Sequence, residues 1–344
     1  MLIDKSNTTT KAKYINDDGS FKSGTPVNIS DVLQMYVWIP RYKYKLFNVS
    51  GATTSVQMIE IEFENSTTSK SSGSQNSEWL THPAFTFGTT ELNGIWVGKF
   101  ESSNSTSDLK IIPNVSSLRS QTVGSMFNAS RAIETTAKYG LTSSEVDTHM
   151  MKNMEWGAVA YLTNSKYGIY IDASSCINSE CEVWINSNSN YTTGCAGSSV
   201  SAGSSSLCNQ WNTSTGVNAS TTGNIYGIYD MSGGAYEYIM GNMTDSSGNF
   251  YPASSGLIQP ESKYYDLYTY GTSNSDYLRG HLGDATRETN NWNSDYTSFI
   301  ASYAPWFVRG GLNTDQALGG IFHFHDLNGR AHDSYSFRIT ITKE

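Results

Sequence analysis

The histidines near the carboxyl end have the spacing that comes closest to a metal site. His323 and His325 are two residues apart, so in a strand their side chains would share one face, and His332 follows closely. Two imidazoles alone leave a tetrahedral zinc site half built. Exposed histidines in a recognition surface are the commoner arrangement, so we interpret these residues as ligand-binding and leave the metal site unassigned.

All four cysteines lie in one polar window, at Cys176, Cys181, Cys195 and Cys208, and none has the C-x-x-C spacing of redox or zinc sites. Four cysteines allow three pairings. Local bridges, Cys176 to Cys181 and Cys195 to Cys208, would hold a loop that is rich in Ser, Gly and Asn. The alternative is four free thiols in a cytosolic protein, but clustering in a polar loop favours disulfides and an oxidising compartment.

Other catalytic signatures fail on inspection. The run from Gly94 to Lys99 resembles a phosphate-binding loop, but it is one residue short, and Phe100 stands where Ser or Thr would bind magnesium. The sequence contains neither His-Glu-x-x-His nor Gly-x-Ser-x-Gly. We therefore predict that the chain is not an enzyme.

Hydrophobic periodicity predicts the elements that must position these residues. Strands are expected at 36–39, 56–64, 94–101 and 336–342, and a first helix at about 117–139, ended by Gly140. A second helix is expected to begin at the capping-box pattern Thr142-Ser-Ser-Glu145. Its core-facing stripe would be formed by Met150, Met154, Ala158, Tyr161 and Leu162. Long loops between helices and late Gly- and aromatic-rich strands predict an α+β fold.

Several segments match, in order, the motifs of one known family. They are Tyr36–Pro40 (Tyr-Val-Trp-Ile-Pro), Gly94–Glu101, Met154–Tyr161, Asn224–Tyr238 (with Asp-Met-Ser-Gly-Gly-Ala-Tyr-Glu-Tyr), Phe307–Gly311 (Phe-Val-Arg-Gly-Gly) and Ser336–Arg338. Together they resemble the formylglycine-generating enzyme (sulfatase-modifying factor) family. The resemblance spans about 36–342. It implies a loop-rich α+β domain of the C-type-lectin-like fold at 35–344, with two helices, short twisted antiparallel strands and a Cys-containing insertion at about 165–222.

A closer resemblance concerns three segments, Trp38–Lys45, Leu282–Thr286 and Pro305–Gly311. They are similar to segments of phage and gut-bacterial surface proteins of this fold, which include variable proteins of diversity-generating retroelements. The randomised residues of those proteins lie between Arg-Gly-Gly and the final Phe-Arg strand. The resemblance therefore implies a ligand face at 312–335, where adaptable polar groups surround a few aromatics. The candidate ligand-binding residues are Asn313, Asp315, Gln316, His323, His325, Asp326, Asn328, Arg330, His332, Asp333 and Tyr335.

A second set of residues is expected to build the frame. Four tryptophans should dominate a modest core because each buries a large aromatic surface. Four charged residues lie among apolar neighbours, where a lone charge is costly, so we expect ion pairs or backbone hydrogen bonds. Glycines fit turns that need positive φ or a close backbone approach. The structural candidates are Trp38, Trp96, Trp156, Trp306, Asp230, Glu237, Arg309, Arg338, Gly310, Gly311 and Phe337.

The family's own chemistry is the alternative. Its oxidase binds copper through a pair of cysteines near the carboxyl end, and here no cysteine follows Cys208, so the soft ligand pair is missing. Gly234 replaces the asparagine of the family motif, which removes one oxygen from a calcium site, although Glu237 remains. We expect no cofactor and keep calcium as the open alternative.

The charge of −9, without a Lys/Arg cluster, argues against nucleic acid as a partner. No run approaches the ~20 apolar residues that would cross a bilayer, so no membrane insertion is expected. The predicted partner is a protein or glycan receptor on a cell surface. Residues 1–34 are expected to be an attachment or linker segment that joins a virion, pilus or envelope partner. The expected location is extracellular, on a cell surface or on a virion; a purely structural virion or pilus component is a further alternative.

Overall fold

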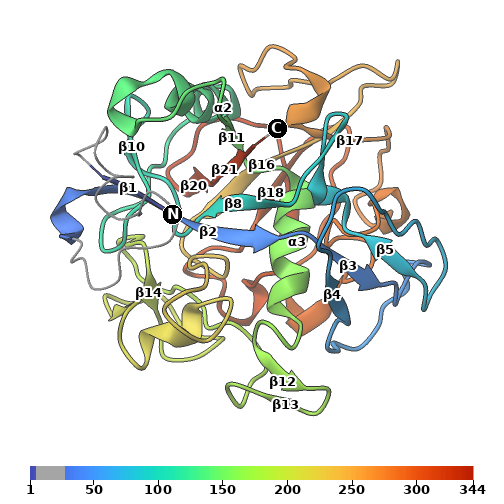
Figure 1. Cartoon of the computed structure of the whole chain (residues 1–344), viewed down its shortest axis with the longest axis horizontal. Coiled ribbons are helices and arrows are strands. Elements are labelled where there is room, and N and C mark those ends of the chain that lie inside the picture. Colours follow the sequence, from blue (N-terminus) through green and yellow to red (C-terminus); the bar gives the residue numbers. More distant parts are fainter. Residues whose placement is uncertain (5–27, 344) are drawn as a thin grey trace.

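The computed structural model describes residues 1–4 and 28–343, which form a mixed, strand-rich fold (Figure 1). The described residues contain two five-stranded sheets, one three-stranded sheet and four small hairpins, with two α-helices. Helix α3 lies near the centre of the view, with β2 to its left and the three-stranded β4–β3–β5 sheet to its right (Figure 1). The expectation of an α+β, loop-rich chain is therefore confirmed.

The first five-stranded sheet joins the two ends of the chain. It has the order β1-β2-β8-β21-β11, and its neighbouring strands are antiparallel. Its strands are β1 (Leu2–Asp4), β2 (Val32–Pro40), β8 (Gly94–Gly98), β21 (Ile339–Thr342) and β11 (Asp147–Met150). The expected strand at 36–39 is part of β2, and the one expected at 94–101 ends earlier, since β8 stops at Gly98.

The amino end corrects the predicted boundary at residue 34. Strand β1 pairs with β2, and the Met1 amino group donates a hydrogen bond to the Tyr36 carbonyl at 2.7 Å. Residues 1–4 and the start of β2 are thus part of the domain. The rest of the predicted attachment segment, residues 5–27, lies outside the described residues.

The second five-stranded sheet is organised around strand β16. Strand β18 pairs with one side of β16, while β20 and β17 pair in parallel with its first and last residues, and β19 extends the sheet beyond β18. The bounds are β16 (Tyr236–Met243), β17 (Asp266–Tyr268), β18 (Trp306–Arg309), β19 (Phe324–Leu327) and β20 (Tyr335–Phe337).

The predicted terminal strand at 336–342 is in fact two strands. Strand β20 belongs to the second sheet and β21 to the first, and Arg338 lies between them. Residues 335–342 are all buried on both faces, so the alternating sequence carries no sign of the break. Arg338 is therefore placed where the chain passes from one sheet to the other.

The remaining strands are short. The expected strand at 56–64 shrinks to β4 (Ile61–Phe63), which pairs with β3 (Tyr42–Lys45), and β3 pairs in turn with β5 (Trp79–Thr81). The four hairpins are β6 (Thr86–Phe87) with β7 (Thr90–Glu91), β9 (Ser103–Ser105) with β10 (Asp108–Lys110), β12 (Tyr170–Asp172) with β13 (Ser175–Cys176), and β14 (Cys195–Ala196) with β15 (Asn209–Gln210).

The first predicted helix is broken into three pieces. Helix α2 (Val123–Arg131) is capped by Thr122, whose hydroxyl accepts from the Ser125 amide at 3.2 Å. Two 3-10 turns continue to Tyr139, and Gly140, at φ +65°, ends them as expected. The 3-10 helices are η2 (Ile29–Asp31), η3 (Pro83–Phe85), η4 (Ala132–Thr135), η5 (Ala137–Tyr139), η6 (Gly216–Ala219), η7 (Ser262–Tyr264), η8 (Tyr277–Arg279), η9 (Trp292–Ser294) and η10 (Gln316–Leu318).

The predicted start of the second helix is wrong. The Thr142-to-Glu145 segment forms an isolated turn, residues 147–150 form strand β11, and helix α3 begins only at Asn153 and ends at Thr163. The physical reason is tertiary, because residues 147–150 pair with the carboxyl-terminal strand β21. From Met154 onward the expected core-facing residues are buried or half-buried on the helix, but Met150 lies in the strand.

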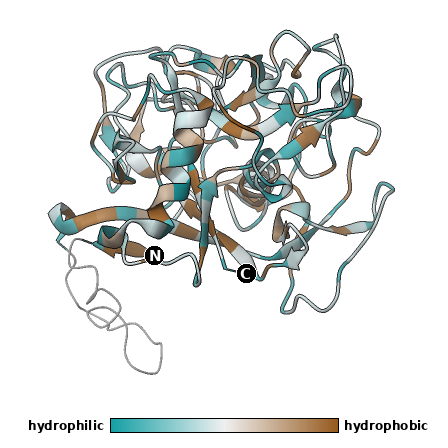
Figure 2. Ribbon diagram, turned by 90° about the horizontal axis from the view of Figure 1, so that it is seen from above, coloured by the Kyte–Doolittle hydropathy of each residue, from teal (hydrophilic) through white to brown (hydrophobic). Residues whose placement is uncertain are grey.

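The tryptophans divide between core and surface. Trp156 and Trp306 are fully buried, as predicted, and so is Trp292, which the sequence analysis did not single out. Trp38, however, is 39% exposed and packs against the half-buried Trp96, with ring centroids 5.0 Å apart. The pair covers the surface of the first sheet and does not dominate the core. Figure 2 shows hydrophobic colour concentrated on the strands, while the long loops are mostly hydrophilic or intermediate.

Candidate functional site

The predicted ligand face begins at a glycine turn that folds the chain back on itself. Gly310 and Gly311 have φ of +85° and +76°, a region that favours glycine. A Cβ on Gly311 would lie 2.4 Å from the Cα of Gly319. These glycines therefore bring the two ends of a short loop into contact before the chain enters β19.

A cluster of histidines and tyrosines occupies the end of this loop. The Tyr236 hydroxyl donates to Asp315 Oδ2 at 2.8 Å, and the Tyr236 ring meets the His325 ring edge-on at 4.6 Å. Tyr296, which is 49% exposed, lies beside both His323 and His325. We call these five residues the histidine–tyrosine cluster. It combines exposed aromatic surface with hydrogen-bonding groups.

The two clustered histidines form a hydrogen-bonded chain. His323 Nδ1 lies 2.8 Å from the Leu318 carbonyl and must donate to it. His323 Nε2 then accepts from His325 Nδ1 at 3.0 Å, which leaves His325 Nε2 as an acceptor. Burial lowers the pKa of His323 to about 4 and that of His325 to about 3, so both rings are neutral at neutral pH.

A metal has little to bind at this point, because the two facing nitrogens already hydrogen-bond each other. Within residues 1–4 and 28–343, no three His, Cys, Asp or Glu side chains gather so that they could hold a metal ion. His332 lies on the following turn, where its Nδ1 accepts from the Ser334 amide at 3.2 Å.

The turn at 328–333 forms a second exposed region. Asn328 Oδ1 accepts from the Arg330 amide at 3.2 Å, and Arg330, His332 and Asp333 are exposed. The Asp333 carbonyl accepts from the Arg119 guanidinium, which holds the turn from outside the predicted segment. The backbone of this turn is therefore supported while its side chains reach solvent.

The structure divides the predicted ligand-binding residues by exposure. Three of them are buried and support the surface instead of forming it: Asn313, His323 and Tyr335, which are 2%, 1% and 7% exposed. The others are exposed or half-buried: Asp315, Gln316, His325, Asp326, Asn328, Arg330, His332 and Asp333.

Sequence reasoning missed the aromatic residues that complete this surface. Tyr236 and Tyr296 come from other parts of the chain, and Tyr303, 63% exposed, hydrogen-bonds the half-buried Asp326. These residues lie tens of positions from their partners. No local pattern links them, so only the tertiary structure brings them together.

A buried ion pair joins the two five-stranded sheets. The Arg338 guanidinium donates to both oxygens of Glu237, at 2.5 and 3.1 Å, and also to the carbonyls of Gly98 and Tyr229 at 2.7 and 2.9 Å. Arg338 and Glu237 are fully buried. Arg338 therefore connects the second sheet, through Glu237, to strand β8 of the first. The expected pairing of the buried charges is confirmed here.

Two further buried carboxyls, Asp230 and Glu101, lie close enough to Arg338 to feel its positive charge. Asp230 accepts from the Asn186 amide at 2.8 Å and from the Gly194 amide at 2.9 Å. Glu101 accepts from the Ala235 amide at 2.9 Å. Burial, together with the neighbouring Glu237 and Asp230, raises the pKa of Glu101 well above its usual range. One guanidinium thus faces three carboxyls, and burial favours the protonated form of Glu101.

The Glu101 carboxyl also explains the glycine at position 234. A Cβ on Gly234 would lie 2.4 Å from Glu101 Oε1, and the residue has φ of +77°. Glu101 thus fills the space that an asparagine side chain would need. Because Glu237 is engaged by Arg338, its oxygens are already committed to an ion pair.

Arg309 is stabilised differently from Arg338. It donates to the Ala285 carbonyl at 3.0 Å and lies over the rings of Trp156 and Phe324. Burial lowers the pKa of this guanidinium to about 10, so it stays charged at neutral pH. The predicted backbone hydrogen bond is confirmed, and the guanidinium also donates to Asn153 Oδ1 at 3.4 Å and contacts aromatic faces.

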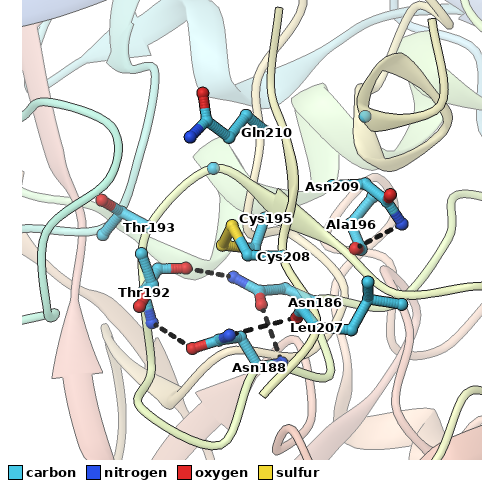
Figure 3. The surroundings of a disulfide bond; sticks show 12 residues. Asn186, Asn188, Thr192, Thr193, Cys195, Ala196, Leu207, Cys208, Asn209 and Gln210 are labelled. Carbon is cyan, nitrogen blue, oxygen red and sulfur yellow. Dashed lines mark hydrogen bonds between the residues drawn. A yellow bond between two sulfur atoms is a disulfide. The ribbon is translucent and has the colours of Figure 1, made fainter. Parts of the chain in front are cut away.

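The cysteines form the two local disulfides, Cys176–Cys181 and Cys195–Cys208, as expected. Around the second bridge, asparagine side chains act as partners for loop backbone (Figure 3). Asn188 Nδ2 donates to the Leu207 carbonyl at 3.1 Å, and the Asn188 carbonyl accepts from buried Asn313 at 2.9 Å. Asn188 thereby links the disulfide loop to the base of the predicted ligand face.

Buried carboxyls should also control the pH dependence of folding. Burial raises the pKa of Asp295 to about 8, and burial together with Asp295 raises the pKa of Glu182 to about 9. The raised pKa of Glu101 has the same effect on the pH dependence of stability. Opposing them, burial lowers the pKa of Lys99 to about 7 and that of the Met1 amino group to about 6.

We expect the free energy of unfolding to fall by on the order of 2 kcal/mol between about pH 6.5 and about pH 8.5. A carboxyl with a raised pKa stabilises the fold below its unfolded pKa, and this stability is lost as the pH rises to its folded pKa. The two amines act oppositely, and the carboxyls outnumber them. Urea unfolding at a series of pH values measures the trend, and Glu182→Gln should reduce its slope. A stability that rises over this range would contradict the assignment.

No helix in the described residues has both the length and the hydrophobicity needed to cross a bilayer. In comparisons with known proteins, the sequence matches no protein-family model and no curated protein.

Proposed function

We propose that this chain is a non-catalytic binding protein of the C-type-lectin-like fold, an adhesin or a phage receptor-binding protein. One observation carries the proposal: exposed polar and aromatic side chains gather at the end of a segment whose base is buried and rigidly hydrogen-bonded. The exposed part includes Gln316, His325 and Arg330, while Asn313 and His323 are buried beneath it. Binding surfaces in which a fixed base presents adaptable groups have this organisation.

The C-type-lectin-like fold is supported by where the family-like motifs meet. Glu237 from one motif pairs with Arg338 from another, and Arg309 lies over Trp156 of a third. Residues as far apart as Trp156 and Arg309, 153 positions, thus form one buried frame. This is the arrangement expected if the resemblance reflects a shared fold.

The buried frame would tolerate replacement of the exposed side chains in segment 312–335. Side chains at Gln316, Arg330, His332 and Asp333 reach solvent, so their replacement leaves the core contacts in place. We therefore propose that segment 312–335 is a variable ligand face of the diversity-generating-retroelement type. Its partner would be a protein or glycan receptor on a cell surface.

The proposed location is extracellular, on a cell or a virion. Two disulfides are the bonds that an oxidising compartment forms and preserves. The amino-terminal segment would attach the domain to a virion, pilus or envelope partner.

The test is a combined variant, Gln316→Ala, Arg330→Ala, His332→Ala and Asp333→Ala. Labelled protein would be added to a panel of bacterial strains and epithelial cells, and bound protein would be measured by flow cytometry. We expect binding to be lost while each exposed change alters stability by no more than about 0.5 kcal/mol. The matched control is Asp172→Ala with Ser174→Ala, in the β12–β13 hairpin. Unchanged binding, or a collapse of thermal stability in the combined variant, would refute the proposal.

A further inference from the structure

Two exposed tyrosines lie beside the proposed ligand face but outside segment 312–335. The Tyr296 ring lies beside the rings of His323 and His325, with centroids 5.9 and 6.2 Å away. Tyr303 is more exposed still, and its hydroxyl hydrogen-bonds the half-buried carboxylate of Asp326 in β19. We call Tyr296, Tyr303 and Asp326 the tyrosine–carboxylate site.

The backbone holds both tyrosines against the edge of the second sheet. The amide and the carbonyl of Phe324 in β19 bond the backbone of residues 296–298 at 3.1 and 2.9 Å. Ala301 and Ala304 exchange two backbone hydrogen bonds, at 3.2 and 2.8 Å, and so close a tight turn that contains Tyr303. The two rings are therefore presented from a fixed backbone, which limits the entropy lost when a ligand binds.

Asp326 carries a negative charge that no lysine or arginine neutralises within the part of the chain that the structure describes. Its Oδ1 accepts from the Ser298 hydroxyl at 2.7 Å, and its other partner is the Tyr303 hydroxyl, so both donors are neutral. Asp315 has the same kind of environment, since it accepts from the Tyr236 hydroxyl at 2.8 Å. Two carboxylates without a basic partner thus lie at this end of the ligand face.

The described groups around Asp326 leave its charge unopposed at the surface. Burial lowers the pKa of the adjacent His325 to about 3, so this ring is neutral at neutral pH. The Arg309 guanidinium is fully buried, and that of Arg330 hydrogen-bonds Tyr335. The tyrosine–carboxylate site therefore has a negative potential, which attracts a cation and repels an anion.

We propose that the tyrosine–carboxylate site binds a lysine or arginine side chain of a protein receptor. This inference rests on the proposed function and names the chemical group that the ligand face recognises. The cation lies against the rings of Tyr296 and Tyr303, whose negative π faces attract it, and Asp326 supplies the opposite charge. The apolar stem of the bound side chain packs on Leu318, which is exposed and whose carbonyl accepts from the Tyr296 amide at 2.9 Å.

A protein is the source that fits this chemistry best. Neutral and acidic sugars bring hydroxyls or anionic groups, and a surface of negative potential gains nothing from the first and repels the second. Contacts between tyrosine and arginine are common at the centres of protein interfaces, where a few such residues supply most of the binding energy.

A peptide probe tests the chemistry without knowledge of the receptor. A fluorescein-labelled peptide in which arginine alternates with glycine and serine would be titrated with the full chain and followed by fluorescence polarisation. Its control has citrulline in place of arginine, which keeps the shape but removes the charge, and we expect only the arginine peptide to bind. Exchanging sodium chloride for tetramethylammonium chloride at equal ionic strength should weaken binding, because the organic cation competes for the aromatic rings.

The double variant Tyr303→Ala with Asp326→Asn should weaken binding of the arginine peptide by about tenfold, since it removes one ring and one charge. Tyr303→Phe keeps the ring and should weaken binding by no more than about twofold. The matched control is Tyr226→Ala with Asp172→Asn, which removes an exposed ring and an exposed carboxylate elsewhere. Thermal unfolding checks that the variants are folded.

Equal binding of the arginine and citrulline peptides would overturn the proposal, and so would equal losses in the double variant and its matched control. On cells, trypsin treatment should abolish binding, because it cleaves surface proteins after lysine and arginine. Binding that survives trypsin but is displaced by choline would assign the cation to a lipid or polysaccharide and refute a protein receptor.

Failure of this inference can be distinguished from failure of the proposed function. If the combined variant at 316, 330, 332 and 333 loses cell binding while Tyr303→Ala with Asp326→Asn binds the same cells as well as the unaltered chain, the ligand face is retained and only its recognition of a cation is wrong. If both variants lose cell binding and the arginine peptide binds as expected, both proposals are supported.

Discussion

Replacing Arg338 with methionine is expected to destabilise the fold by ~3–5 kcal/mol, the cost of removing one partner of a buried ion pair. Without the guanidinium, Glu237 and Asp230 would be buried without a cation, beside Glu101. The Gly98 carbonyl would also lose its charged donor. Chemical unfolding monitored by tryptophan fluorescence measures the loss.

The double variant Arg338→Met with Glu237→Gln separates this cause from simple loss of packing. Because the amide removes the uncompensated charge, the double variant should recover part of the lost stability. Arg330→Met is the matched control, since Arg330 is exposed and should change stability by no more than about 0.5 kcal/mol. A double variant no more stable than Arg338→Met would mean that the ion pair is not the source of the effect.

Removing the Cys195–Cys208 bridge by the double change to serine should cost ~3 kcal/mol, mainly because the bridge limits the unfolded chain. Cys195 is fully buried, so the native loop also loses packing. The loop contacts Asn313 through Asn188. We therefore expect faster hydrogen exchange both in the loop and at the base of segment 312–335, measured by mass spectrometry.

Removing the Cys176–Cys181 bridge is the matched control. It closes a shorter loop, and its two cysteines are half-buried, so its loss should cost less. Exchange in segment 312–335 should stay unchanged in this variant. Equal effects of the two double variants on that segment would show that the loop does not support the ligand face.

Much of the frame could be predicted from the sequence because its determinants are local or depend on burial alone. Short spacing in a polar loop favoured the two disulfides that the structure contains, among three possible pairings. The buried face of α3, with Ala158 and Tyr161, follows from helical periodicity. The pairing of Arg338 and the backbone contact of Arg309 follow from the cost of burying a lone charge. None of these inferences depends on which distant strand pairs with the segment concerned.

The candidate site could be predicted only in part. The sequence identified the segment that carries the exposed residues, but it could not separate Arg330, which is exposed, from Asn313, which is buried. Exposure in a loop depends on what packs against it. Here the packing partners include Asn188 and Tyr236, 125 and 79 residues away from their contacts.

Local sequence favoured the two short disulfides and indicated the helical core face and the need to pair the buried charges, since each depends on near neighbours or on desolvation. Only the tertiary structure decided that residues 147–150 form a strand, that the terminal strand breaks at Arg338 and that Trp38 lies on the surface. Pairing with distant segments settles all three, since β11 pairs with β21, β20 with β16 and β2 with β8. Hydrogen bonds between distant segments override local preference.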